Sequence, residues 1–160
     1  MSLKSCSVIV SHYKILEDRI THKYYDNGNV KEVSKKDGTS IFYIWGYNGQ
    51  YPLVKLDNFS ESNIITAIQN NINAVVNASN SDVNTSTENS LRTALTTLRN
   101  SVPNAMMTSY TYDPLIGVTS ITDPRGYTVY YEYDDFNRLK QVKDADGKII
   151  SENEYHYKGQ

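Results

Sequence analysis

The chain has 160 residues, which is enough for one domain with its own core and too few for two large ones. Its 16 Lys and Arg and 18 Asp and Glu give a formal net charge of -2, so no basic surface predicts nucleic-acid binding. One cysteine excludes an intrachain disulfide and a thiolate metal cage. No apolar run reaches the roughly 18 residues of a membrane span, and we expect neither membrane insertion nor a signal segment.

The aromatic composition is unusual, with 14 tyrosines against 3 Phe and 1 Trp. All the tyrosines and all 8 glycines lie outside residues 58–104, a stretch rich in Asn, Ser and Thr. Two kinds of sequence therefore share one module. We predict N-terminal hairpins at residues 1–57, an inserted Asn-rich helical hairpin at residues 58–104, and C-terminal repeats at residues 105–160.

In the N-terminal part, turn residues separate short apolar segments. Asp37-Gly38 is typical of a tight turn, because glycine adopts positive φ without strain and aspartate hydrogen-bonds its own backbone. Strands are therefore predicted at residues 30–34 and 40–46. The second strand is apolar on both faces, so we expect it to be covered on both sides.

The middle stretch has the periodicity of helices. Apolar residues recur mostly at spacings of three and four over residues 64–76, and again over residues 91–98. Ser60 is the predicted N-cap of the first helix, and Pro103 follows the end of the second. The bridge at residues 77–87 has no apolar period and predicts a loop. The helices are expected to form a hairpin whose apolar stripe packs on one face of a sheet.

The C-terminal part again alternates between extended segments and turns. Strands are predicted at residues 106–112, 128–133 and 148–155, with a turn at Asp146-Gly147. Consecutive hairpins of this kind join into one antiparallel sheet. The predicted fold class is therefore α+β, an antiparallel sheet of hairpins with an inserted two-helix hairpin.

Three Tyr-Asp segments align in phase. In each, the first apolar residue precedes a late glycine by eight positions, and the last two segments start 21 residues apart. Such a period is typical of repeat architectures. We expect each Tyr to pack against the neighbouring hairpin and each Asp to cap its turn, which makes these residues structural. The motif residues are Tyr25, Asp26, Gly28 and Gly38, then Tyr112, Asp113 and Gly126, then Tyr133, Asp134, Arg138 and Gly147.

Residues 133–139, read as Tyr-Asp-Asp-Phe-Asn-Arg-Leu and followed by Gly147, resemble the YD repeat Y-D-x-x-G-R-L of the Rhs and teneurin-like superfamily. Asn137 stands where the family usually has glycine, and asparagine also tolerates the left-handed conformation. Residues 43–52 look like Bacteroidetes-type members, so the chain resembles a fragment of such a protein.

The resemblance implies a non-catalytic structural segment of a large bacterial protein that is secreted or on the cell surface. In that family, hairpins build a shell that encloses a C-terminal polymorphic toxin. The implied partners are the neighbouring hairpins of a longer chain. No segment resembles the self-cleaving core of some members, so autoproteolysis is not expected.

The tyrosines leave a second function open. Exposed tyrosine faces can bind sugars, which would make the chain a carbohydrate-binding or cell-surface adhesion module with a glycan as partner. Tyrosines at strand spacing also form cross-strand ladders. A binding module should leave several rings exposed and contiguous, whereas a shell segment should bury them.

Catalytic and metal-binding patterns were sought among the polar residues. His12, His22 and His156 have no metal or catalytic spacing around them, and the paired acids Asp134-Asp135 and Asp144/Asp146 fit turns. We expect no enzyme activity, no catalytic or metal site and no cofactor. Unpaired strand edges at both ends, near residues 6–10 and after Tyr157, predict self-association of the chain.

Overall fold

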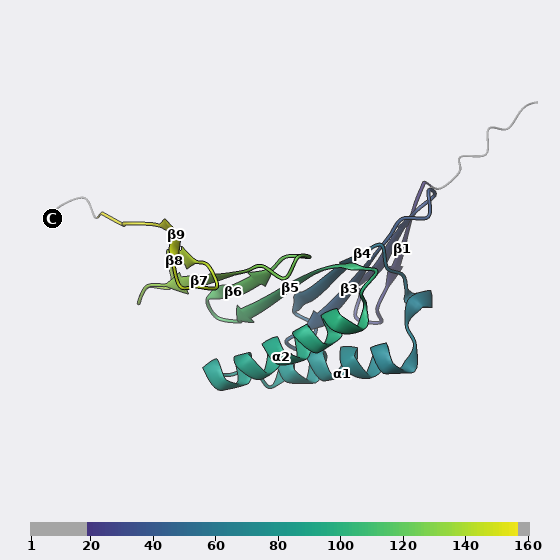
Figure 1. The fold of residues 1–160 in the computed structure, drawn as a ribbon, viewed down its shortest axis with the longest axis horizontal. Coiled ribbons are helices and arrows are strands. Elements are labelled where there is room, and N and C mark those ends of the chain that lie inside the picture. The colour runs from purple at the N-terminus through teal and green to yellow at the C-terminus, as the bar shows by residue number, and fades with distance from the viewer. Residues whose placement is uncertain (1–18, 157–160) are drawn as a thin grey trace, which may run out of the picture.

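The computed structural model describes residues 19–156, so the expected N-terminal edge at residues 6–10 and the end of the chain after Tyr157 lie outside the described part. Nine antiparallel strands form one sheet in which strand order follows chain order (Figure 1). This confirms the predicted α+β class. The strands are β1 (Ile20–Tyr24), β2 (Val30–Lys35), β3 (Ser40–Gly46), β4 (Tyr51–Asp57), β5 (Met106–Asp113), β6 (Gly117–Thr122), β7 (Thr128–Tyr133), β8 (Leu139–Lys143) and β9 (Ile149–Glu152).

One five-residue turn recurs between the strands. In its clearest copy, Asp134 N–H donates to Arg138 O at 2.9 Å and Asn137 N–H donates to Asp134 O at 2.9 Å. Asn137 has φ 59°, so it fills the left-handed position that other copies give to glycine. Both predicted turns, at Asp37-Gly38 and Asp146-Gly147, are confirmed. The copies are residues 25–29, 35–39, 123–127, 134–138 and 144–148.

The predicted strands at 30–34, 40–46, 106–112 and 128–133 correspond to β2, β3, β5 and β7. The strand expected at 148–155 is shorter and ends at Glu152. Two strands carry no clear sequence signal. All five residues of β1 are exposed, so it has no buried face, and β4 contains Pro52, which usually argues against a strand. Pro52 is tolerated at an irregularity in the β3–β4 register.

The insert contains two helices, α1 (Thr66–Asn80) and α2 (Thr85–Ser101), as expected, but with different ends. Ser60 precedes the short 3-10 turn η1 (Glu61–Asn63), so its predicted role as N-cap of the long helix is wrong. The predicted loop at 77–87 is also wrong, because only residues 81–84 separate the helices. Asn84 ends this loop as the N-cap of α2, since its side chain accepts from two backbone N–H groups.

Both helices lie on one face of the sheet, and α1 contacts β3 while α2 contacts β5 (Figure 1). Burial alternates along β3, with alternate residues only half-buried. The expectation that β3 is covered on both faces is therefore wrong, because the helices cover one. The buried core lies between this face and the helices and includes Phe42, Ile44, Leu53, Val54, Leu56, Ile68, Ile72, Val75, Leu91, Leu95, Leu98 and Met107.

Candidate functional site

From β5 onwards, three tyrosine hydroxyls each donate a hydrogen bond to the preceding strand. Tyr112 on β5 donates to Pro52 O on β4, Tyr133 on β7 donates to Val118 O on β6, and Tyr155 after β9 donates to Leu139 O on β8. All three bonds measure 2.9 Å. Because the donors are 21 and 22 residues apart, the contact has the period of the repeat. We call these three bonds the tyrosine cross-links.

Tyr133 also depends on a glycine in the neighbouring strand. A Cβ atom on Gly117 would lie 2.8 Å from the Tyr133 hydroxyl and 3.3 Å from Cζ of the same ring. Gly117 thus leaves the space over which the ring lies. Burial raises the pKa of the Tyr133 hydroxyl, with a smaller contribution from Tyr131.

In the first repeat, the tyrosine that pairs across the hairpin lies one position earlier than the in-phase alignment of the three Tyr-Asp segments predicts. Tyr24 pairs with Val30 as Tyr133 pairs with Leu139, and Tyr25 opens its turn where Asp134 opens the later one. Tyr25 donates to Tyr43 O at 2.9 Å, and therefore reaches forward to β3. Burial raises the pKa of Tyr25 to about 12, with a smaller electrostatic contribution from Glu61.

Acidic and amide side chains hold the turns of the repeat. Asp134 Oδ1 accepts from the N–H groups of Phe136 and Arg138, and Oδ2 accepts from Arg138 Nε at 2.8 Å. The hydrogen bond from the Arg138 side chain holds the pKa of Asp134 below its ordinary value. Asp113 Oδ1 accepts from Leu115 N–H.

The first turn is held by a different residue. There Asn27 Oδ1 accepts from Asn29 N–H at 3.1 Å. The capping role predicted for Asp26 thus falls to Asn27. Gly28, Gly38, Gly126 and Gly147 fill the positive-φ positions of their turns, as the turn chemistry predicts.

A buried carboxylate attaches the start of the insert to the sheet. Glu32 on β2 is 4% exposed and accepts from Glu61 N–H at 2.8 Å and from Ser34 Oγ at 2.7 Å. Burial alone would raise the pKa of Glu32. The two hydrogen bonds and the charge of Lys23 outweigh burial and hold that pKa below its ordinary value.

A buried tyrosine attaches the far end of α1 and the following loop. The Tyr47 hydroxyl donates to Asp82 Oδ2 at 2.8 Å and accepts from Tyr112 N–H at 3.0 Å. Its ring packs edge-on against Tyr51 and Tyr112, which stack on each other with centroids 4.8 Å apart. Tyrosine thus supplies part of the core, and one cluster connects the insert with β4 and β5.

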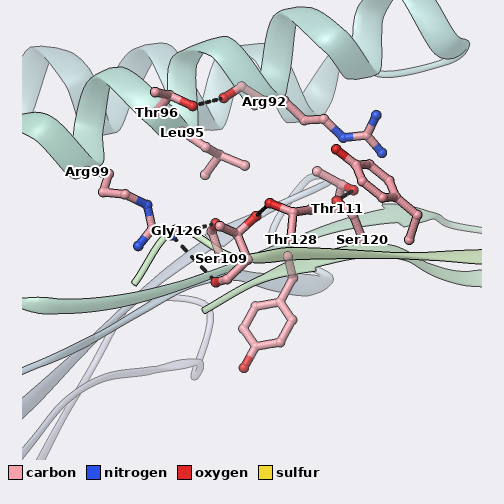
Figure 2. A pocket seen from close by; sticks show the side chains of 12 residues that line it. Arg92, Leu95, Thr96, Arg99, Ser109, Thr111, Ser120, Gly126 and Thr128 are labelled. Atoms are coloured by element: carbon pink, nitrogen blue, oxygen red, sulfur yellow. Dashed lines mark hydrogen bonds between the residues drawn. The ribbon is translucent and has the colours of Figure 1, made fainter. Parts of the chain in front are cut away.

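Several hollows lie between the insert and the sheet. One, of 410 Å³, lies between α1 and β2–β3 and combines an apolar floor with side-chain amides at its edge. Another, of 240 Å³, is a cleft between α2 and β5–β7 (Figure 2). Sequence reasoning identified neither of these two. The one available signal for the cleft was the run of Ser and Thr at alternate positions of β5 and β6.

Residues 19–156 contain no group of three or more His, Cys, Asp and Glu able to hold a metal ion. Within the same range, no helix has the length and apolar character needed to cross a membrane. His22 lies on the exposed strand β1 and stacks on Tyr24, and His156 lies 3.5 Å from Glu154 with both side chains exposed. None of the described histidines thus belongs to a catalytic arrangement.

Comparison with known proteins identifies the repeat. Residues 117–149 match the family model described as RHS Repeat. The matched segment contains β6, β7 and β8, the three turns that follow them, and the first residue of β9. A search of curated proteins finds no match to the chain. The matched segment contains Tyr133, Asp134, Arg138 and Gly147 of the predicted motif. The chain therefore contains a structural Rhs repeat at residues 117–149.

Proposed function

We propose that the chain is a non-catalytic segment of a large bacterial Rhs/YD-repeat protein, secreted or on the cell surface. Its hairpins contribute to the wall of a shell that encloses a C-terminal polymorphic toxin. The observation that supports this most strongly is the set of tyrosine cross-links. At Tyr112, Tyr133 and Tyr155, a side chain that bonds to the preceding strand joins hairpins into a continuous strip, which is what a wall requires.

The open edges of the two outermost described strands, β1 and β9, support a sheet that continues with further strands in the proposed shell. β1 pairs only with β2, and β9 pairs only with β8, so each has one edge without a strand among residues 19–156. On β9, Ile149 and Ile150 are 46% and 54% exposed. Exposed apolar edge strands pair readily with further strands. In the shell the neighbouring hairpins of the parent protein would cover them, and in isolation a second copy of the chain would do so.

The shell is tested on the whole reading frame that encodes this chain. We would express that frame and image the purified protein by electron cryomicroscopy. The expected result is a hollow particle whose wall contains these hairpins, with extra density inside. A solid globular particle, or a chain whose hairpins do not join further hairpins, would exclude the role.

The second candidate is a glycan-binding or adhesion module, although the exposed tyrosines do not form the contiguous surface expected of one, because Tyr24 on β1 and Tyr155 after β9 lie at opposite ends of the sheet. Tyr24, Tyr127 and Tyr155 are 58%, 52% and 45% exposed, whereas the other described tyrosines are half-buried or buried. A glycan array with the 160-residue chain tests this role. Binding that is lost in Tyr127→Ala and kept in Leu115→Ala, a matched change at an exposed turn, would support it, and an empty array would exclude it.

A further inference from the structure

The chain has two asparagine–glycine pairs, Asn27-Gly28 and Asn48-Gly49. The first lies in the turn between β1 and β2, and the second lies in the turn between β3 and β4. An Asn-Gly pair deamidates without an enzyme when the glycine backbone nitrogen attacks the asparagine side-chain amide, because glycine has no side chain to hinder this approach. The hydrogen bonds around each pair decide how readily the attack occurs.

At Asn27-Gly28 both reacting groups are held by the turn. Gly28 N–H donates to Tyr25 O at 2.9 Å, so the proton that must leave is already bonded. Asn27 Oδ1 accepts from Asn29 N–H at 3.1 Å, which restrains rotation of the side-chain amide. Attack by the Gly28 nitrogen would break both bonds. This pair is therefore protected in the folded chain.

At Asn48-Gly49 the same two groups are free. Gly49 N–H has no hydrogen-bond acceptor among residues 19–156, and the Asn48 side-chain amide has no hydrogen-bond partner in that range. Asn29 Nδ2 donates to Gly49 O at 2.7 Å, but this bond holds the carbonyl and leaves the nitrogen available. Asn48 is exposed, so water reaches the amide.

The turn between β3 and β4 is also where the sheet holds the C-terminal end of α1. Asn48 N–H donates to Asn80 Oδ1 at 2.7 Å, and Tyr47 N–H donates to Ser79 Oγ at 3.2 Å. Just beyond the helix, Asp82 Oδ2 accepts from the Tyr47 hydroxyl at 2.8 Å. A chemical change at Asn48 therefore acts on the attachment of the insert.

We propose that Asn48 is a site of spontaneous deamidation, and that its modification loosens the C-terminal end of α1 from the sheet. The Gly49 nitrogen gives its proton to hydroxide and forms a bond to Asn48 Cγ. The bond from Cγ to Nδ2 breaks, and ammonia leaves a cyclic succinimide. Water then opens the ring at either carbonyl, which gives an aspartate or an isoaspartate at position 48. Water is consumed and ammonia released, with no oxidation or reduction.

Both products disturb the attachment. Each places a carboxylate beside the C-terminal end of α1, where the last helical carbonyls carry partial negative charge and where Asp82 already adds a carboxylate. Isoaspartate also routes the main chain through the former side chain, which lengthens the turn and displaces the N–H groups of Tyr47 and Asn48. The site lies in the contact of the insert with the sheet and does not depend on the proposed shell.

The test incubates the folded 160-residue chain in mildly alkaline buffer and follows both pairs by mass spectrometry after trypsin digestion. Cleavage after lysine places the pairs on separate peptides, residues 24–31 and 37–55. Deamidation raises the peptide mass, because a hydroxyl replaces an amino group, and fragment spectra assign it to a residue. We expect Asn48 to react at least roughly tenfold faster than Asn27 in the folded chain, and both to react at similar rates in urea.

Two outcomes would overturn the site. One is an equal rate at Asn27 and Asn48 in the folded chain. The other is an Asn48 that stays unmodified in the folded chain while both residues react in urea, because the fold would then protect both pairs.

Variants test the effect on the helix. Asn48→Asp reproduces the aspartate product, and Asn27→Asp makes the same change at the protected pair, which has no hydrogen bond to α1. Hydrogen exchange of the backbone amides in the last turn of α1 is the readout, because local opening exposes them. We expect exchange about twofold to fivefold faster in Asn48→Asp and unchanged in Asn27→Asp. Unchanged exchange in Asn48→Asp, or equal acceleration in both variants, would refute the loosening.

Discussion

Gly46 lies at the end of β3, where the C-terminal part of α1 meets the sheet. A Cβ atom on Gly46 would overlap Leu53 Cδ1 and Ser79 Oγ and would lie 2.6 Å from Leu53 Cγ. Leu53 is 0% exposed and Ser79 is 1% exposed, so neither side chain can move into solvent. Ser79 Oγ also accepts from Tyr47 N–H at 3.2 Å, a bond that any displacement of the helix would weaken. Gly46→Ala therefore tests how closely α1 packs on β3.

The expected loss of stability in Gly46→Ala is the balance of opposing contributions to the free energy of unfolding. Overpacking of a buried site costs about 1–3 kcal/mol, and a weakened buried hydrogen bond costs about 1 kcal/mol. Alanine in a strand gains about 0.5–1 kcal/mol over glycine. The steric contribution is larger, so Gly46→Ala should destabilise the chain by about 2 kcal/mol. Urea unfolding followed by circular dichroism measures this as a lower midpoint with an unchanged slope.

The matched control is Asn77→Ala, on the exposed face of α1. Alanine has the highest helix propensity, so this variant should be unchanged or slightly more stable. An unchanged or higher midpoint for Gly46→Ala would show that α1 does not contact the end of β3 closely, and the described packing of the insert would be wrong.

Three further predictions concern the repeat, the insert and the sheet edge. Tyr133→Phe should lower the free energy of unfolding by about 1 kcal/mol, because it removes the tyrosine cross-link. Tyr133→Ala should lower it by about 2 kcal/mol, because the ring is only half-buried. If urea unfolding gave the same stability for both variants and wild type, the ring would lie in solvent. The pKa of Glu32 is lowered on folding, so the ionised carboxylate stabilises the folded chain. This stabilisation is fully present at pH values above the ordinary carboxyl pKa, and it is lost as the pH falls through the lowered pKa of the folded state. The unfolding free energy of Glu32→Gln should therefore fall less steeply below about pH 4 than that of wild type, and parallel profiles would contradict this account. Light scattering should show that the chain self-associates. Ile150→Lys on β9 should shift the chain towards monomer, whereas Leu115→Lys at an exposed turn should not. A wild-type chain that stays monomeric at high concentration would exclude edge pairing.

The repeat part of the fold could be predicted because its information is local. A turn such as Asp146-Gly147 specifies its own geometry, and the apolar residues beside it set the strand register. The first repeat shows the limit of motif matching. The residue types of Tyr25-Asp26 match the motif, but Gly28 fixes the turn so that Tyr24, and not Tyr25, pairs with Val30 across the hairpin.

The insert and the cleft depend on contacts between distant residues. Asn and Ser at the end of α1 have weak helix propensity, which favoured a loop at residues 77–87. Ser79 is nevertheless buried against Gly46, and this packing extends the helix to Asn80. The polar residues that line the cleft come from α2, β5, β6 and β7, and only the folded chain brings them together.

The order of strands has a consequence for how the protein forms. Each strand after β1 pairs with the strand made just before it, so every partner already exists when a new strand emerges from the ribosome. Such a sheet can grow from its N-terminal end without waiting for distant sequence. The one delay falls at the insert, because Asp57 pairs with Met106 and residues 58–105 must be synthesised between them. Vectorial folding should therefore pause once, at β4, and resume when α2 is complete.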